Sequence, residues 1–317
     1  MALAPRHAVS AMRDRAQMNE NKTQQEIDEM RASSRRDFLK TSGAVAAAAF
    51  AGANNLNAAP PHMPIGLQLY SVRNQLPHDF EGTLRQLHTL GYRVVEAAGY
   101  YNKPAGEFRG AMEQAGLRCI SSHLTLELLR TKLDENLDYA HKLGLEYLVC
   151  SSAGGVHRDP SAKGEKLSLD DWRYVAGEFN RVGEKIKAAG MTFAVHNHTP
   201  EFAVENGTLV YDELLRLTDP KLVYFEMDCG WVQASGHDPV QYLRKSPERF
   251  PLMHVKDMEG TGKDEKSVVL GHGHLDYGPI LAAATGLKQY FIEQEEFAGD
   301  PMTELREDAE YMRRVNA

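Results

Sequence analysis

From residue 64 onward, the sequence alternates eight short apolar runs with eight longer segments of helical pattern. The apolar runs are rich in β-branched and aromatic residues and are bounded by turn residues, which is typical of buried strands. The expected strands are 65–70, 94–97, 119–123, 147–151, 192–198, 223–228, 252–256 and 291–295. The expected helices are 79–90, 105–115, 127–143, 170–189, 211–218, 238–245, 278–285 and 301–315. This alternation predicts an α/β chain folded as one (β/α)8 barrel domain, which typically needs about 250 residues.

An open, doubly wound sheet is the alternative to the barrel. Such sheets usually carry a glycine-rich phosphate-binding loop after their first strand. Here the first expected strand runs into Leu69-Tyr70-Ser71-Val72-Arg73, which contains no glycine. The sequence therefore favours the barrel. Its longest expected loop is the glycine-rich segment 258–277, which is a candidate for a mobile lid.

The chain divides into an N-terminal extension with a signal peptide, residues 1–59, and the barrel domain, residues 60–317. Residues 34–40 read SRRDFLK, the order of a twin-arginine export motif, and the Ala-rich run 44–53 follows. That run is far shorter than the roughly 20 residues that span a bilayer. We therefore expect export by the Tat machinery to a periplasmic or other extracytoplasmic space, no stable membrane span, and translation starting at Met18.

The charge balance argues against nucleic acid as a partner. The chain has 36 basic and 44 acidic residues and a formal net charge of -8. A negative protein repels the phosphate backbone, so an endonuclease is disfavoured. The three cysteines, an odd number at wide spacings, suggest buried free thiols and no disulfide framework. Assembly into a homo-oligomer remains open.

Polar residues stand where almost every expected strand ends. In a barrel of this type the active site lies at the C-terminal ends of the strands. The residues at these ends are Tyr70, Glu96, His123, Ser151, Ser152, His196, His198, Glu226, Asp228, His254, Lys256, Glu293 and Glu295. The last four strands carry polar pairs at spacing i, i+2, so both members of a pair share a face. Such a mixture of His, Asp and Glu suits Mn, Co, Mg or Zn, any of which could act as a Lewis acid on sugar oxygens.

Several of these segments resemble the xylose isomerase-like sugar phosphate isomerase/epimerase family. Residues 65–70 (IGLQLY) resemble its first strand, and residues 195–202 (VHNHTPEF) resemble its HNHxxEF segment. Residues 225–231 (FEMDCGW), 254–258 (HVKDM) and 292–294 (IEQ) resemble its last three strands, in the same order. The resemblance implies a (β/α)8 barrel that binds one divalent metal ion and a carbohydrate.

The resemblance also implies a ligand set for the metal. In relatives the ligands are Glu, Asp, His and Glu from strands five to eight, which become His196, Asp228, His254 and Glu293 here. His196 departs from the pattern, and the two glutamates of the epimerases also serve as paired bases. The imidazole of His196 could act as the second base, or Glu201 could extend into the site and do so. Alternatively, the reaction could differ from a simple epimerisation. The candidate catalytic residues are therefore Glu293, His196, Glu201 and Lys256.

Other candidates have both a functional and a structural interpretation. Lys256 could stabilise an enolate or form a salt bridge with Glu226. The candidates for substrate binding, each of which could equally serve packing or orientation, are Tyr70, Glu96, His123, His198 and Trp231.

The resemblance leads first to a metal-dependent sugar isomerase or epimerase, with Mn expected and Co, Mg or Zn possible. It would remove the proton α to a carbonyl and pass through an enediolate. The alternative is a lyase or hydrolase that acts on 3-keto-glycosides through the same enolate. A silent sugar-binding barrel and an endonuclease-like barrel are further hypotheses from other classes.

Overall fold

The computed structural model describes residues 63–162, 164–260 and 264–315. The export motif and the proposed start at Met18 lie outside this range. Within it, eight parallel strands form a closed barrel in the order β1-β12-β9-β8-β5-β4-β3-β2. The strands are β1 Gly66–Gln68, β2 Val94–Ala97, β3 Arg118–Thr125, β4 Tyr147–Ser152, β5 Thr192–His196, β8 Tyr224–Asp228, β9 Leu252–Val255 and β12 Gln289–Ile292. The predicted (β/α)8 barrel is confirmed.

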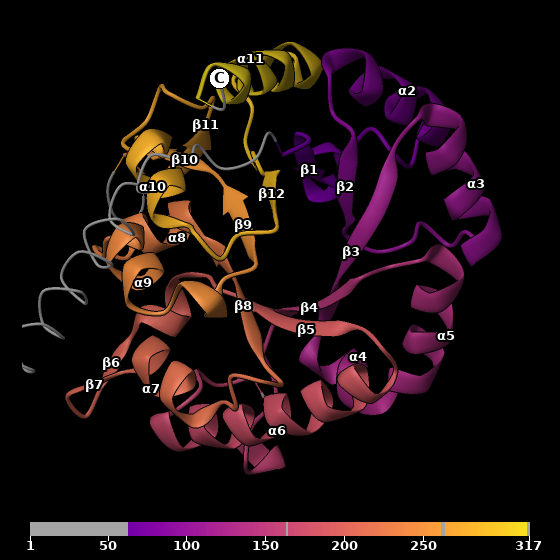
Figure 1. Ribbon diagram of the computed structural model, residues 1–317. Coiled ribbons are helices and arrows are strands. Elements are labelled where there is room, and N and C mark those ends of the chain that lie inside the picture. The colour runs from indigo at the N-terminus through magenta and orange to yellow at the C-terminus, as the bar shows by residue number, and fades with distance from the viewer. Residues whose placement is uncertain (1–62, 163, 261–263, 316–317) are drawn as a thin grey trace, which may run out of the picture. The chain divides into compact units, whose positions relative to one another are not determined.

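Helices surround the strands on all sides (Figure 1). They are α2 Phe80–Leu90, α3 Ala105–Ala115, α4 Leu126–Thr131, α5 Leu133–Leu143, α6 Leu169–Ala188, α7 Val210–Leu217, α8 Cys229–Ala234, α9 Pro239–Lys245, α10 Tyr277–Ala283 and α11 Pro301–Val315. Short 3-10 turns are η2 Leu69–Val72, η3 Pro160–Ala162, η4 Thr199–Phe202 and η5 Pro247–Arg249. The last helix returns to the first, because Arg313 of α11 donates to the carbonyl of Leu90 at 3.2 Å. Within the described residues, no helix is both long and apolar enough to cross a membrane.

Several elements differ from the sequence-based expectation, among them an unexpected hairpin of β6 Val204–Glu205 and β7 Thr208–Leu209. The expected first strand ends early, because the side chain of Gln68 accepts a hydrogen bond from Tyr70 N and starts the turn η2. The expected helix 127–143 is two helices that meet at Lys132, whose φ of −133° is not helical. Helix α8 was not expected, and Asp228 starts it by accepting a hydrogen bond from Trp231 N at 3.0 Å.

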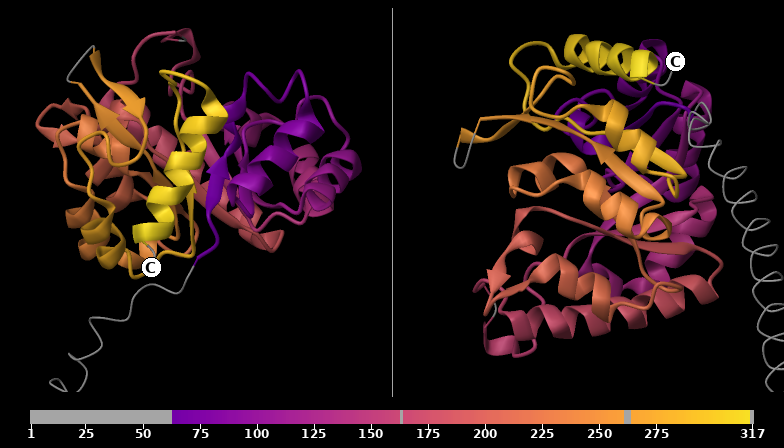
Figure 2. Two further views of the ribbon diagram at one scale, coloured as in Figure 1. Left: turned by 90° about the horizontal axis from the view of Figure 1, so that it is seen from above. Right: turned by 60° about the vertical axis from the view of Figure 1, so that its left-hand side comes forward.

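The glycine-rich segment after β9 is held to the barrel in its described part. It contains a hairpin of β10 Asp257–Glu259 and β11 Lys266–Val268, which extends beyond the strands (Figure 2). The completely buried carboxylate of Asp257 accepts hydrogen bonds from the backbone N–H groups of Gly271, Gly273 and Leu275 at 2.9–3.0 Å. The described part of this segment is therefore an anchored loop, and the expectation of a mobile lid is not supported.

The barrel interior changes from apolar to polar along the strands. Six side chains form a separate apolar cluster inside the barrel: Val94, Ile120, Val149, Ala194, Leu252 and Phe291. Two residues further along their strands stand Glu96, Ser151, His196, His254 and Glu293. Because strand side chains alternate, these residues point to the same inner face. The apolar cluster thus forms the floor of a polar site.

Candidate active site

The four residues expected to bind metal come together at this polar layer. One ligand atom from each of His196, Asp228, His254 and Glu293 lies within 4.8 Å of the other three. His254 Nδ1 lies 3.0 Å from Glu293 Oε2 and 3.8 Å from Asp228 Oδ2. All four side chains are buried. We refer to these residues as the His-Asp-His-Glu cluster.

A second cluster shares two histidines with the first. It consists of His123, His196, Glu226 and His254, whose ligand atoms also lie within 4.8 Å of one another. Glu226 Oε2 lies 2.7 Å from His123, 3.2 Å from His254 and 3.3 Å from His196. Glu226 is not among the metal ligands predicted from the sequence. Its i, i+2 spacing from Asp228 was the available signal.

Glu96 supports both clusters from the side of β2. Its Oε1 lies 2.8 Å from His254 Nε2 and 2.9 Å from His123 Nε2. Gln68 donates to the same oxygen at 2.7 Å, and the hydroxyl of Ser121 donates to the other. Glu96 was expected to accept hydrogen bonds from substrate hydroxyls, but it is completely buried and does not line the cavity. In this structure it orients histidines, and the sequence analysis missed Gln68 and Ser121 as its partners.

Lys256 lies between three carboxylates. Its Nζ is 3.0 Å from Asp228 Oδ2, 2.9 Å from Glu293 Oε2 and 2.5 Å from Glu295 Oε1. No contact with Glu226 is formed, so the alternative salt bridge considered from the sequence is wrong. The Lys256 side chain is completely buried and does not line the cavity, so its ammonium contacts the carboxylates and does not face the space where a substrate would lie.

Backbone contacts fix Asp228 and Lys256 in place. The side chain of Asn197 donates to Asp228 O at 3.2 Å and accepts from Asp228 N at 3.1 Å. The Tyr277 hydroxyl bonds both the N–H and the carbonyl of Lys256 at 2.8 Å. Gly230 lets the lysine side chain pass, because a Cβ there would lie 2.8 Å from Lys256 Cγ. Tyr277 has no local sequence pattern that points to this role, whereas Asn197 stands inside the HNH segment.

The charges in the site follow from these contacts. Burial alone would raise the pKa of Glu293, but Lys256 and His254 hold that pKa well below its usual range. Burial disfavours charge on His123, yet Glu96 and Glu226 outweigh it and raise the pKa of His123 to about 10. Burial and the nearby His254 lower the pKa of His196 well below its usual value. His196 is therefore a neutral imidazole with a lone pair available.

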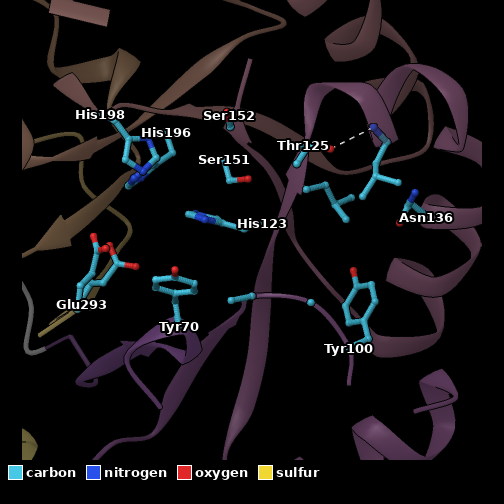
Figure 3. Close-up of a pocket in the computed structure, with 15 residues that line it drawn as sticks. Tyr70, Tyr100, His123, Thr125, Asn136, Ser151, Ser152, His196, His198 and Glu293 are labelled. Atoms are coloured by element: carbon cyan, nitrogen blue, oxygen red, sulfur yellow. Dashed lines mark hydrogen bonds between the residues drawn. The ribbon is translucent and has the colours of Figure 1, made fainter. Parts of the chain in front are cut away.

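A cavity of about 520 Å³ opens over the clusters. His123, His196, His198, Glu293 and Glu295 line it, and Tyr70 lies at its wall. Figure 3 shows His196, His198 and Glu293 at one end and Tyr100, Thr125 and Asn136 at the other, with His123 between them. The expected substrate-binding residues Tyr70, His123 and His198 thus share one cavity.

Glu201 and Trp231, like Glu96 and Lys256, lie outside that cavity and outside both clusters. The Glu201 carboxylate accepts a hydrogen bond from His198 N at 2.9 Å and lines a neighbouring cavity of about 530 Å³. Burial raises the pKa of Glu201 to about 7. Trp231 lies against Lys256, whose Nζ is 4.6 Å from the indole ring. Trp231 is thus placed to pack against Lys256, and it does not line the cavity.

The residues of the His-Asp-His-Glu cluster fit a divalent metal. Two imidazoles and two carboxylates are a donor set that Mn, Co and Zn accept. Within the described part of the chain, His196 Nδ1 is buried, forms no hydrogen bond and faces Glu226 Oε2 at 3.3 Å. Asp228 Oδ2 is buried with it and is paired with the ammonium of Lys256 at 3.0 Å. A buried imidazole nitrogen is normally satisfied, so His196 Nδ1 is available to a metal ion.

The family described as "Xylose isomerase-like TIM barrel" matches residues 84–315, which is most of the barrel. The chain belongs to this family. The resemblance drawn from the sequence is thereby confirmed. A twin-arginine translocation (TAT) pathway signal sequence matches residues 33–52, so the chain carries a signal for export across the cytoplasmic membrane.

Individual relatives differ in the reaction that their names state. An inosose dehydratase from Geobacillus kaustophilus is 26% identical over 266 residues, covering 73% of this chain and 86% of the relative. The structure of a sugar phosphate isomerase/epimerase from Parabacteroides distasonis is similar at 28% identity and a TM-score of 0.68, covering 80% of this chain and 98% of that one. The structure of the IOLI protein with a bound zinc atom has a TM-score of 0.61 at 13% identity, covering 80% and 98%, which shows the shared fold alone.

Proposed function

We propose that this protein is an exported, metal-dependent lyase that removes the proton α to the ketone of a keto-sugar and expels the substituent at the β carbon. The observation that carries the proposal is the pairing of Glu293 and His123 on one cavity beside the His-Asp-His-Glu cluster. One is a carboxylate held by cationic partners, and the other is an imidazole held between two carboxylates. An elimination needs one group that accepts a proton and a second group that donates one.

The metal would be held by His196, Asp228, His254 and Glu293. When bound, a divalent ion supplies Lewis-acid polarisation of the substrate carbonyl. Mn is our first expectation, and Co, Mg and Zn are compatible with the same donors. The buried Lys256 keeps the carboxylates of Asp228 and Glu293 close together, since without a cation they would repel each other.

The chain's own residues would move the protons. Glu293 takes the proton from the carbon next to the ketone, and the electron pair of that C–H bond becomes the new C=C bond. The C–O bond at the β carbon then breaks, and His123 delivers a proton to the departing oxygen. The products are an unsaturated ketone and an alcohol, or water when the leaving group is a hydroxyl. His198 is a further polar contact for hydroxyls, because it lines the same cavity.

A sugar isomerase or epimerase is the second candidate, and the name of the relative from Parabacteroides distasonis favours it. Epimerisation at one carbon needs a proton carrier on each face of the substrate. The family's second glutamate is replaced by His196, which weakens that symmetric scheme. The name inosose dehydratase, carried by the relative from Geobacillus kaustophilus that this chain matches over 86% of its length, supports the elimination.

Product analysis separates the two reactions. The mature, manganese-loaded protein is incubated in D2O with a 3-keto-glucoside, and the mixture is followed by NMR. Elimination predicts an unsaturated ketone together with the free alcohol. Exchange of the α proton for deuterium, with the glycosidic bond intact, would instead support the epimerase. Recovery of unchanged, unexchanged substrate would contradict both.

The export signal bears on where the substrate is found. A protein carrying a twin-arginine signal folds before export, which allows metal to be loaded inside the cell. We propose a periplasmic or extracytoplasmic location, where unphosphorylated glycosides are the expected substrates. Detection of the mature chain in a periplasmic fraction tests the location, and its retention in the cytoplasm would contradict it.

A further inference from the structure

The cavity over the clusters has a second end that the proposed elimination does not use. Tyr100, Leu124, Thr125, Leu128 and Asn136 line this region, which we call the apolar end. Among the residues that the structure describes, no charged side chain lines the apolar end. Figure 3 shows Tyr100, Thr125 and Asn136 on the side of the cavity away from His196, His198 and Glu293. Any substrate that fills the whole cavity must therefore have a polar half and a second half of different chemistry.

The apolar end exposes hydrophobic surface. Among the described residues, the large hydrophobic side chains exposed to solvent are Tyr70, Leu128 and Val204. Tyr70 and Leu128 both line this one cavity. Exposed hydrophobic side chains that converge on a cavity commonly mark a place where a ligand binds.

Two polar side chains at the apolar end bond to backbone, and the Tyr100 hydroxyl there is buried. Thr125 Oγ1 accepts a hydrogen bond from Leu128 N at 3.3 Å, and the Asn136 amide donates to Lys132 O at 2.8 Å. A second sugar ring would bring several hydroxyls that need partners, and only the Thr125 hydroxyl proton and the remaining groups of the Asn136 amide are left to meet them. An aromatic ring makes no such demand.

The wall formed by Tyr100 is rigid. Its ring stacks on Tyr139 with ring centres 3.9 Å apart and meets Phe108 edge to face at 5.8 Å. Gly99 beside it has φ +90°, a conformation that other residues rarely adopt, so the turn that presents Tyr100 depends on glycine. A preformed aromatic wall binds a flat ligand without a large ordering cost.

From these observations we infer that the apolar end is a subsite for an aromatic leaving group, so that the substrate class is aryl keto-glycosides. The inference rests on the proposed function for the assignment of the keto-sugar to the histidine end. The elimination described above then releases a phenol: the bond between the anomeric carbon and the phenolic oxygen breaks, the phenolic oxygen takes the proton, and the sugar keeps the new C=C bond.

Binding of unoxidised glycosides tests the subsite without any turnover. Calorimetry would compare 4-nitrophenyl β-D-glucoside, methyl β-D-glucoside and cellobiose on the manganese-loaded protein. We expect the aryl glucoside to bind about tenfold more tightly than the methyl glucoside. Equal affinity for the two, no binding of either, or tighter binding of cellobiose than of the aryl glucoside would overturn the proposal.

Variants at Leu128 link the preference to the apolar end. Leu128→Ala should lower the aryl-over-methyl preference on the order of fivefold, and Leu128→Arg should abolish it. Val204→Ala is the matched control, because Val204 is exposed but lines neither the site cavity nor its neighbour. An unchanged preference in both Leu128 variants would contradict the subsite. If the preference depends on Leu128 but no keto-glycoside is turned over, the proposed function fails and the subsite stands.

Discussion

Lys256 Nζ lies 3.0 Å from Asp228 Oδ2 inside the barrel, and neither side chain is exposed to solvent. Burial would lower the pKa of the lysine, but Asp228, Glu293 and Glu295 outweigh it and raise that pKa above its usual value. The ammonium is therefore permanently charged and balances the carboxylates that we assign to the metal. This arrangement links the stability of the barrel to the chemistry of the site.

Replacing Lys256 by Met should destabilise the protein strongly. The substitution leaves buried carboxylates without their cation, which costs about 3 kcal/mol or more in the free energy of unfolding. Urea unfolding of the mature protein measures the change. Lys166→Met is the control, because Lys166 forms a largely exposed ion pair with Glu205 and should cost at most about 1 kcal/mol. A similar loss of unfolding free energy in both variants would contradict a special stabilising role for the buried Lys256.

Gly230→Ala should displace the Lys256 side chain by a steric clash. The new methyl group would lie 2.8 Å from Lys256 Cγ, so the lysine must move. Overpacking of this kind costs about 1–3 kcal/mol, and we expect turnover to fall with it. Gly177→Ala on α6 is the control, because a Cβ there meets nothing within 4 Å and should be neutral or slightly stabilising. Thermal unfolding of the two variants side by side gives the answer.

The ligand assignment predicts a difference in metal content. Asp228→Ala and His254→Ala should each lose the bound metal, whereas Glu201→Gln should retain about one ion per chain. Glu201 lies outside both clusters, and Gln still accepts the hydrogen bond from His198 N. Elemental analysis after extensive dialysis measures the content. If Glu201→Gln lost its metal while Asp228→Ala kept it, the ligand assignment would be wrong and the metal site would lie near Glu201.

The stability of the barrel should depend on pH through Asp308. Burial raises the pKa of Asp308 to about 7, above the roughly 3.9 of an unfolded chain. The folded state therefore holds the proton more tightly, and its stabilisation is complete below about pH 4 and is lost as pH rises through 7.

Asp308→Asn removes this dependence and should retain the hydrogen bond from Leu270 N. The variant should be more stable than the parent protein by a few kcal/mol at pH 8, on the order set by the shift, and by less at pH 5. Urea unfolding at the two pH values measures this difference. Glu310→Gln on the exposed side of the same helix is the control and should show no such trend. A constant difference between the parent and Asp308→Asn would argue against a buried, protonated Asp308.

The sequence predicted the number and order of the strands because each strand is a short apolar run between turn residues. It did not predict the break at Lys132 or the turn after Gln68, since both depend on backbone geometry that the hydrophobic pattern does not encode. The i, i+2 pairs identified the polar layer, because alternation on a strand is a local property. Contacts between strands, such as Glu96 with His254 or Tyr277 with Lys256, depend on barrel closure and were not visible in the sequence.

The central claim is that a divalent metal on His196, Asp228, His254 and Glu293 is required for the elimination. The most direct test measures phenol release from an aryl 3-keto-glucoside by the mature protein as purified, after chelation, and after adding manganese back. The account predicts turnover that disappears on chelation and returns with the added ion. Phenol release that is unaffected by complete removal of metal would contradict it.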